Sequence, residues 1–267
     1  MKNLIVRSFP RTCGFFMLFI FVGLWVGLGM AQAIETKVVV RALAKDGMFI
    51  GTSMGGARII IREAESGLIL AQGHTQGDTG HLPTVMVEPR RRGHPLSNAS
   101  TAKFEARLEL VEPTLVSIEG LAPYGQRQSL IKSSTQLWVI PGRDIIGDGV
   151  ILEFPGFAVD ILKPQAAERV NLSEVRSLSM IANVVMMCGC PVKPGGTWDA
   201  DRYEVAGIVK HNSIQLEAVP FVYADKTSTF QGTLELHKPG LYEVQVYAFD
   251  PQTGNAGVDT VVFKVQE

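Results

Sequence analysis

Two cysteines separated by one glycine, Cys188-Gly189-Cys190, are the residues of this chain best suited to chemistry. Met186 precedes Cys188 by two positions. Alternate residues of an extended strand point to the same face, so this spacing predicts one thioether and two thiols side by side. Soft sulfur ligands of this kind suit Cu(I), and thiolates also bind zinc. The sequence therefore predicts a candidate soft-metal site at Met186, Cys188 and Cys190.

A histidine from a neighbouring strand, His211 or His237, would complete such a metal site. Two other states of the cysteines stay open. In an oxidising compartment the pair forms a disulfide, and Gly189 permits the tight bend that it needs. A ring this small is strained and is therefore easily reduced. In the third state the thiols are unpaired in the core, or bonded between chains.

The first 33 residues have the layout of a secretory signal peptide. Three basic residues lie before position 12, residues 14–30 are uncharged and mostly apolar, and residues 31–33 are Ala-Gln-Ala. We therefore expect export to the periplasm, the cell surface or the medium, with a mature chain that begins at Ile34. The alternative is an uncleaved anchor, because about 20 apolar residues cross a bilayer. Only in that case do we expect the chain to contact a membrane.

Composition limits the classes of partner. Without the leader, 22 basic residues face 26 acidic ones, so the mature chain has a net charge near −4. Nucleic acids require a concentrated positive field, which makes them poor partners for this chain. The one basic cluster, residues 90–92, lies among prolines and glycines and is better explained as a solvated loop. The 46% of hydrophobic residues supply material for a core.

Hydrophobic periodicity predicts strands almost everywhere after the leader. Residues 104–110 alternate apolar and charged side chains, which is typical of a strand with one face in water. Residues 57–63 are rich in isoleucine and end before a Ser-Gly turn. No segment of helical length keeps a period of 3.6 residues, and many short strands between turns indicate sandwiches or barrels. We predict an all-β chain with two consecutive antiparallel β-sandwich domains.

We place the domain boundary at Lys163-Pro164. Residues 34–164 form an irregular set of strands interrupted by proline and glycine, whereas the strands in residues 165–267 are more evenly spaced. Six or seven strands in about 100 residues match the size of an immunoglobulin-like sandwich. The predicted organisation is therefore a signal peptide over residues 1–33, followed by these two domains.

Two family resemblances agree with this organisation. Residues 37–80 contain Gly-Ala at 56–57, a strand, a Ser-Gly turn at 66–67 and a second strand, and they resemble the carboxypeptidase-regulatory-like (transthyretin-like) sandwich. Residues 239–250 resemble the penultimate strand of bacterial immunoglobulin-like domains, in which Tyr242 would form a tyrosine corner. Both resemblances imply folds used for binding or spacing, and neither implies a reaction.

Residues 51–55 match Gly-x-Ser-x-Gly, the nucleophile motif of serine hydrolases, with Ser53 at its centre. That serine must lie on a sharp turn from a strand into a helix. The three consecutive isoleucines that follow, Ile59, Ile60 and Ile61, disfavour a helix. A glycine-rich loop between strands is the better explanation of the motif.

The sequence as a whole predicts an exported, non-enzymatic binding or accessory protein of the cell envelope. Its expected partner is another envelope protein, or a soft metal such as Cu(I) held by the sulfur ligands. The alternative is a structural or adhesive β-sandwich module in which the Cys-Gly-Cys disulfide is inert. A serine hydrolase that uses Ser53 is the third and least supported hypothesis.

Overall fold

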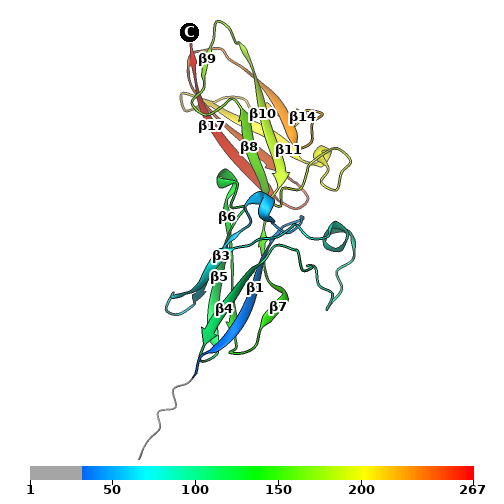
Figure 1. Cartoon of the computed structure of the whole chain (residues 1–267). Coiled ribbons are helices and arrows are strands. Elements are labelled where there is room, and N and C mark those ends of the chain that lie inside the picture. Colours follow the sequence, from blue (N-terminus) through cyan, green and yellow to red (C-terminus); the bar gives the residue numbers. More distant parts are fainter. Residues whose placement is uncertain (1–31) are drawn as a thin grey trace, which may run out of the picture. The chain divides into compact units, whose positions relative to one another are not determined.

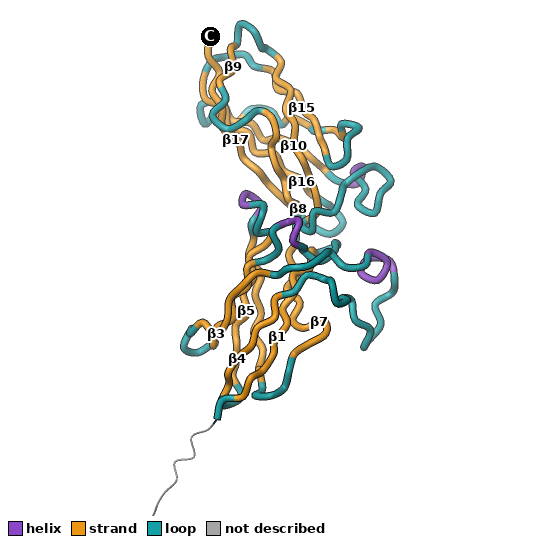
Figure 2. The backbone as a smooth tube through the Cα atoms, viewed as in Figure 1, coloured by secondary structure: helices purple, strands orange, loops and turns teal. Residues whose placement is uncertain are grey.

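The computed structural model describes residues 32–267, and its regular secondary structure is almost entirely β-strand (Figures 1 and 2). The predicted signal peptide falls almost wholly outside the described residues, so that prediction stays untested. Residues Ala33–Glu267 form one compact unit. Among the described helices, none combines the length and the hydropathy needed to cross a bilayer. The prediction of an all-β chain is confirmed.

The first half of the described chain forms two sheets. One sheet has the strand order β4-β1-β7, and the other has the order β3-β2-β5-β6. Neighbouring strands are antiparallel except β1 and β7, which are parallel. The bounds are β1 Ile34–Ala44, β2 Arg58–Glu63, β3 Ile69–His74, β4 Phe104–Leu110, β5 Thr114–Ala122, β6 Ile131–Val139 and β7 Ile145–Phe154.

The core of this half follows from alternation along the strands. In β4 the apolar residues Ala106, Leu108 and Leu110 are buried, while the charged residues between them are exposed. β5 shows the same period of two. β2 contributes Ile59 and Ile61, which are fully buried. Branched side chains pack well on a pleated surface, so the residues that favour extended backbone also supply the core between the sheets.

The second half also forms two sheets. Their strand orders are β14-β15-β10-β8 and β12-β11-β16-β17-β9, and β13 pairs with β11. β17 and β9 are parallel, and the other pairs are antiparallel. The bounds are β8 Phe157–Lys163, β9 Arg169–Asn171, β10 Ser177–Met186, β11 Glu204–His211, β12 Ile214–Gln215, β13 Val219–Pro220, β14 Val222–Tyr223, β15 Thr229–Glu235, β16 Gly240–Phe249 and β17 Ala256–Gln266.

These connections have the pattern of an immunoglobulin-like sandwich. With β8, β10 and β11 as the first three long strands, β8, β10, β14 and β15 share one sheet, while β11, β16 and β17 share the other. This corresponds to the division into an ABED sheet and a CFG sheet. Tyr242 at the start of β16 is buried, and its hydroxyl donates a 3.0 Å hydrogen bond to the backbone oxygen of Lys238. The predicted tyrosine corner is therefore present.

The sheets change partners at Pro155-Gly156, before the predicted boundary at Lys163-Pro164. β8 pairs with β10 of the second half, where Val159 lies opposite Val184. Residues 157–164 therefore belong structurally with the second pair of sheets. The proline at position 164 gives a local signal that resembles a boundary, whereas the pairing of β8 is a long-range contact. The division of the compact unit into two domains stays a prediction.

Candidate functional site

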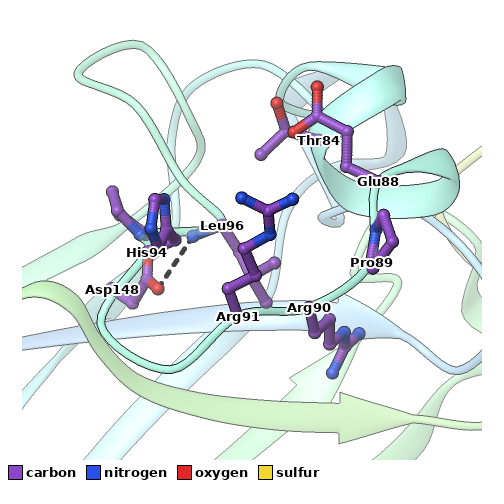
Figure 3. A pocket seen from close by; sticks show the side chains of 9 residues that line it. Thr84, Glu88, Pro89, Arg90, Arg91, His94, Leu96 and Asp148 are labelled. Carbon is purple, nitrogen blue, oxygen red and sulfur yellow. Dashed lines mark hydrogen bonds between the residues drawn. The ribbon is translucent and has the colours of Figure 1, made fainter.

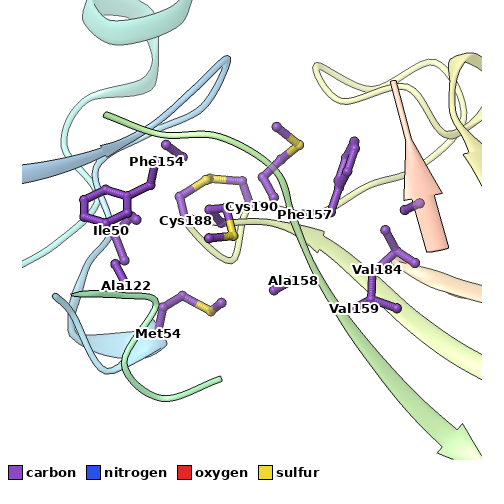
Figure 4. Close-up of a cluster of buried hydrophobic side chains, with 14 of the residues drawn as sticks. Ile50, Met54, Ala122, Phe154, Phe157, Ala158, Val159, Val184, Cys188 and Cys190 are labelled. Carbon is purple, nitrogen blue, oxygen red and sulfur yellow. A yellow bond between two sulfur atoms is a disulfide. The ribbon is translucent and has the colours of Figure 1, made fainter. Parts of the chain in front are cut away.

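Cys188 and Cys190 are joined by a disulfide at the tip of a tight turn after β10 (Figure 4). The Gly189 amide donates a 2.7 Å hydrogen bond to the Met186 carbonyl, and the Met186 amide donates a 3.2 Å bond to the Cys190 carbonyl. Gly189 has φ +76°, a left-handed conformation that glycine adopts without strain. The sequence left three states open, and the structure shows the disulfide.

The turn corrects the prediction that Met186, Cys188 and Cys190 project from one extended strand. β10 ends at Met186, and the chain reverses so that Val185 forms a bridge with Pro191. Met186 is fully buried between the sheets, because it continues the inward-facing series of β10. The backbone turn, and not the alternation of a strand, brings the two sulfur atoms together.

Two methionines of the first half approach this turn, and the sequence analysis did not identify them. Met54 packs against Gly189 so closely that a Cβ on that glycine would lie 2.7 Å from the Met54 Sδ. Figure 4 shows the Met54 side chain beside the disulfide. Met48 lines the same groove as both cysteines. These methionines are more than 130 positions from the cysteines in sequence, so no local motif could have connected them.

The disulfide forms part of the wall of a groove of about 280 Å³. The groove is also lined by Met48, Ser53 and Trp198. Cys188 is 1% exposed and Cys190 is 8% exposed, so solvent reaches the pair mainly at Cys190. Trp198 is buried, and its indole N–H donates a 2.8 Å hydrogen bond to the Asp46 carbonyl. A small, partly apolar groove beside a nearly buried disulfide is the most distinctive chemical feature of this region.

The structure does not bring His211 or His237 to the sulfur atoms. His211 ends β11 and contacts the Pro239 carbonyl at 3.1 Å and the ring of Tyr242 at 4.7 Å between centroids. His237 follows β15, near the start of β10, whereas the cysteines follow its end. β10 has 10 residues. Such a strand is about 30 Å long. The prediction that either histidine completes the site is wrong, because strand direction places both at the opposite end.

No group of three or more His, Cys, Asp or Glu side chains within residues 32–267 is arranged to hold a metal ion. Any metal site at the turn would therefore depend on methionine sulfur in addition to the cysteines. Ser53 lies in the 3-10 helix Thr52–Met54, which is followed by Gly55 and Gly56 and then by β2. This context differs from the strand-to-helix turn of a hydrolase nucleophile. The structure gives no support to the hydrolase hypothesis.

Hydrogen bonds between distant segments join the two halves near this turn. Lys45 Nζ donates to the Thr253 carbonyl at 2.7 Å, and Asn255 Nδ2 donates to the Lys45 carbonyl at 3.0 Å. The Asn255 side-chain oxygen accepts a 2.9 Å bond from the Gly156 amide. Asn255 is fully buried. Each polar group of this amide therefore has a partner, as burial requires.

Acidic groups crowd the same region. Burial, together with the nearby Asp250 carboxylate, raises the pKa of Asp46, although Arg202 and Lys45 partly oppose the shift. Burial and the charges of Asp250 and Asp46 also raise the pKa of Tyr203 to about 12. Tyr203 packs edge-on against Phe157, with centroids 4.9 Å apart. The phenol is therefore neutral at physiological pH and acts as a packing group.

Comparisons with known proteins assign no family to this chain. No family model matches it, and no curated protein matches it significantly. Among solved structures it is similar to an engineered protein, with 14% identity over 45% of this chain and 22% of that protein, at a TM-score of 0.32. It is also similar to the fibronectin(III)-like modules of Clostridium thermocellum CbhA, with 10% identity over 87% of this chain and 94% of theirs, at 0.27.

A third similarity is to a putative membrane anchored protein from Corynebacterium diphtheriae, with 12% identity over 89% of this chain and 46% of that protein, at a TM-score of 0.28. At such low scores these similarities support no assignment of fold or function. The immunoglobulin-like character of the second half therefore rests on its own strand order and its tyrosine corner. The transthyretin-like resemblance of the first half stays a prediction.

Proposed function

We propose that this chain is an exported, non-enzymatic binding module that serves as a rigid accessory part of an envelope complex. The observation that carries this proposal is the junction of the two halves. There Trp198, Asn255 and the disulfide are buried, and hydrogen bonds join residues far apart in sequence. Such a junction supports a fixed arrangement of exposed edges and loops, and rigid scaffolds of this kind present binding surfaces.

Cell fractionation and cross-linking of the full chain test this proposal. We expect the protein in the exported fraction, with a mature N-terminus at Ile34, and we expect discrete cross-linked adducts with an envelope protein. Protein retained in the cytoplasm would contradict the proposal, and so would an exported protein that forms no adduct. The N-terminal sequence of the purified protein distinguishes cleavage from an uncleaved anchor.

A second function, binding of a soft metal such as Cu(I), is favoured by one specific observation. Met48 and Met54 supply thioether sulfur beside the Cys188–Cys190 pair. The disulfide must first be reduced by a dithiol, which is oxidised to its own disulfide as it transfers two electrons and two protons to the cysteines. Cu(I) would then bind the two thiolates and release the two protons. Thiolate and thioether ligands together select Cu(I) over harder ions.

Metal titration of the dithiol-reduced full chain without oxygen tests this second function. With a Cu(I) chelator as competitor, we expect one equivalent of Cu(I) per chain and a sulfur-only coordination shell by X-ray absorption. The Cys188→Ser, Cys190→Ser variant should lose this uptake, and Met54→Leu should weaken it. His211→Ala is the matched control and should bind normally. Equal uptake by the double-serine variant would exclude this site.

A further inference from the structure

A second groove, of about 550 Å³, lies in the long connection between β3 and β4 (Figure 3). Arg91 stands between Glu88 and His94 at this groove, as Figure 3 shows. Leu96 and Asp148 also line it. This groove is separate from the sulfur groove, and none of the functions considered above uses it.

The connection that forms the groove is held in a defined conformation. The Asp148 carboxylate accepts hydrogen bonds from the Leu96 amide at 2.9 Å, the Ser97 amide at 2.9 Å and the Ser97 hydroxyl at 2.6 Å. Val85, in the short helix Pro83–Val87, is buried in the core. The buried guanidinium of Arg41 donates to carbonyls at the end of the connection and to Gly147. A ligand at this groove would therefore meet a preorganised surface.

The arginine side chains at the groove are exposed, and they form no direct ion pair in the described part of the chain although two carboxylates line the same groove. None of the ion pairs within residues 32–267 includes Arg90, Arg91 or Arg92. All three arginines are exposed. The Asp148 carboxylate accepts hydrogen bonds from the Leu96 amide and the Ser97 hydroxyl, and it forms no ion pair with these arginines. An arginine fork left free in this way is suited to bind a carboxylate through two parallel hydrogen bonds.

The other lining groups restrict the ligand class. Glu88 and Asp148 balance the charges of Arg90 and Arg91, so the groove lacks the excess positive charge that a polyphosphate or a nucleic acid requires. Apolar surface comes from Leu96 and from the two prolines that flank the basic run. Isolated carboxylates next to apolar side chains therefore fit the groove better than a dense polyanion.

We infer that this groove binds a short acidic peptide segment of a partner protein, with an Asp or Glu carboxylate on Arg91 and a neighbouring apolar side chain against Leu96. The inference rests on the proposed binding function, because it names the chemistry of the partner. It adds a location for that contact, on the connection between β3 and β4 and away from the disulfide.

Selection from a random seven-residue peptide library displayed on phage, with the immobilised full chain, tests the inference. We expect Asp and Glu to be enriched in the selected peptides. A selected peptide should bind at least about tenfold more weakly when its acidic residue is replaced by the amide, as expected for a charge-assisted hydrogen-bonded pair. Binding should also weaken at high salt.

The Arg90→Gln, Arg91→Gln variant should lose the acidic enrichment. Arg143→Gln is the matched control, because it removes an exposed arginine on the turn between β6 and β7. No acidic enrichment, or unchanged affinity in the double variant, would overturn the inference. Cross-linked adducts that form without the acidic selectivity would refute only the groove, whereas a lack of both would refute the binding function as well.

Discussion

Trp198 shows how a single residue fixes the region around the sulfur groove. Its indole ring is 3% exposed, and its N–H donates to the Asp46 carbonyl at 2.8 Å. Asp46 lies in the turn that follows β1, where it has φ +55°. One side chain therefore joins the loop after the cysteines to the end of a strand about 150 positions earlier. The ring contributes apolar packing, and the hydrogen bond of the N–H fixes the orientation of the ring.

We predict that Trp198→Phe lowers the free energy of unfolding by about 1–3 kcal/mol, because it removes the hydrogen bond and leaves a small cavity. Urea denaturation of the full chain measures the change. Trp138→Phe is the matched control, because Trp138 is 60% exposed. That control should change stability by no more than about 0.5 kcal/mol. Equal losses of unfolding free energy in the two variants would show that the buried contact of Trp198 does not stabilise the fold more than an exposed tryptophan does.

Asp160 and Asp259 form an unfavourable pair of like charges across β8 and β17. Partial burial raises the pKa of Asp160, and the charge of Asp259 raises it further. Asp259 is held in place, because its carboxylate accepts a 2.8 Å bond from the Ile161 amide. A carboxyl whose pKa is raised on folding destabilises the native state when it is charged. This cost decreases as the pH falls through the raised pKa towards the ordinary value for aspartate.

We therefore predict that Asp160→Asn stabilises the full chain at pH 7, by roughly 0.5 kcal/mol or less because solvent screens the pair. The gain should decrease as the pH falls and disappear only well below the ordinary pKa of aspartate, at about pH 2.5, where Asp160 is protonated in both states. Chemical denaturation of both proteins at the two pH values measures the difference. Glu65→Gln, on an exposed turn, is the control. A gain that persists or grows at acidic pH would contradict the assigned charge repulsion.

At the scale of elements, the connection between β3 and β4 depends on contacts with the first half of β7. Asp148 belongs to β7, and it accepts three hydrogen bonds from Leu96 and Ser97, about 50 positions earlier. Burial alone would raise the pKa of Asp148, but these hydrogen bonds, with a contribution from Arg41, lower it overall. The carboxylate is therefore the form that holds the connection in place.

We predict that Asp148→Ala loosens this connection and speeds trypsin cleavage at Arg90, Arg91 and Arg92 by several-fold. Cleavage requires local opening of the chain, and the lost hydrogen bonds make that opening easier. Mass spectrometry of early fragments measures the rate at each site. Asp144→Ala is the control, because Asp144 lies just before β7 and its carboxylate accepts from the Lys37 amide instead of the connection between β3 and β4. If both variants are cleaved at the same rate, Asp148 does not hold this connection.

Acid should act in the same direction as the Asp148→Ala substitution. Because the pKa of Asp148 is lowered in the folded chain, its contribution is present above the ordinary pKa of aspartate and is lost as the pH falls through the lowered value. A decrease in the protection of the connection, measured by hydrogen exchange, is therefore expected only at strongly acidic pH.

At the scale of the whole molecule, residues Ala33–Glu267 form one compact unit although they contain two pairs of sheets. Phe154 and Phe157 lie on either side of the change of sheets, and both are buried in one hydrophobic cluster. Asn255 adds hydrogen bonds to Lys45 and Gly156. Shared burial of this kind couples the stability of the two halves.

We predict that the oxidised full chain unfolds in a single cooperative transition, with equal calorimetric and van't Hoff enthalpies. Asn255→Ala should lower the midpoint and broaden or split the transition, because it leaves buried partners of the amide unsatisfied. Thr253→Ala is the milder control, because the Lys45 contact uses only its backbone carbonyl, and the Thr253 hydroxyl bonds only within the turn, to Asp250 and the Asn255 amide. Two resolved transitions in the unaltered chain would show that the halves are thermodynamically independent.

The sequence by itself determined the features that depend on local pattern. The alternation of residues 104–110 predicted β4, and the Tyr242 segment predicted the tyrosine corner. The spacing of Cys188 and Cys190, with one glycine between them, made a disulfide one of the three states predicted for the pair. In each case the interacting groups lie within a few residues of each other, so side-chain period and turn chemistry were sufficient.

Only the tertiary structure decided which distant groups meet. It placed Met48 and Met54 at the disulfide and His211 and His237 at the far end of the second pair of sheets. It also assigned β8 to the second half and tied Asp148 to the basic connection. Strand order and direction determine these contacts, and they result from pairing between segments far apart in the chain, which a local pattern does not encode.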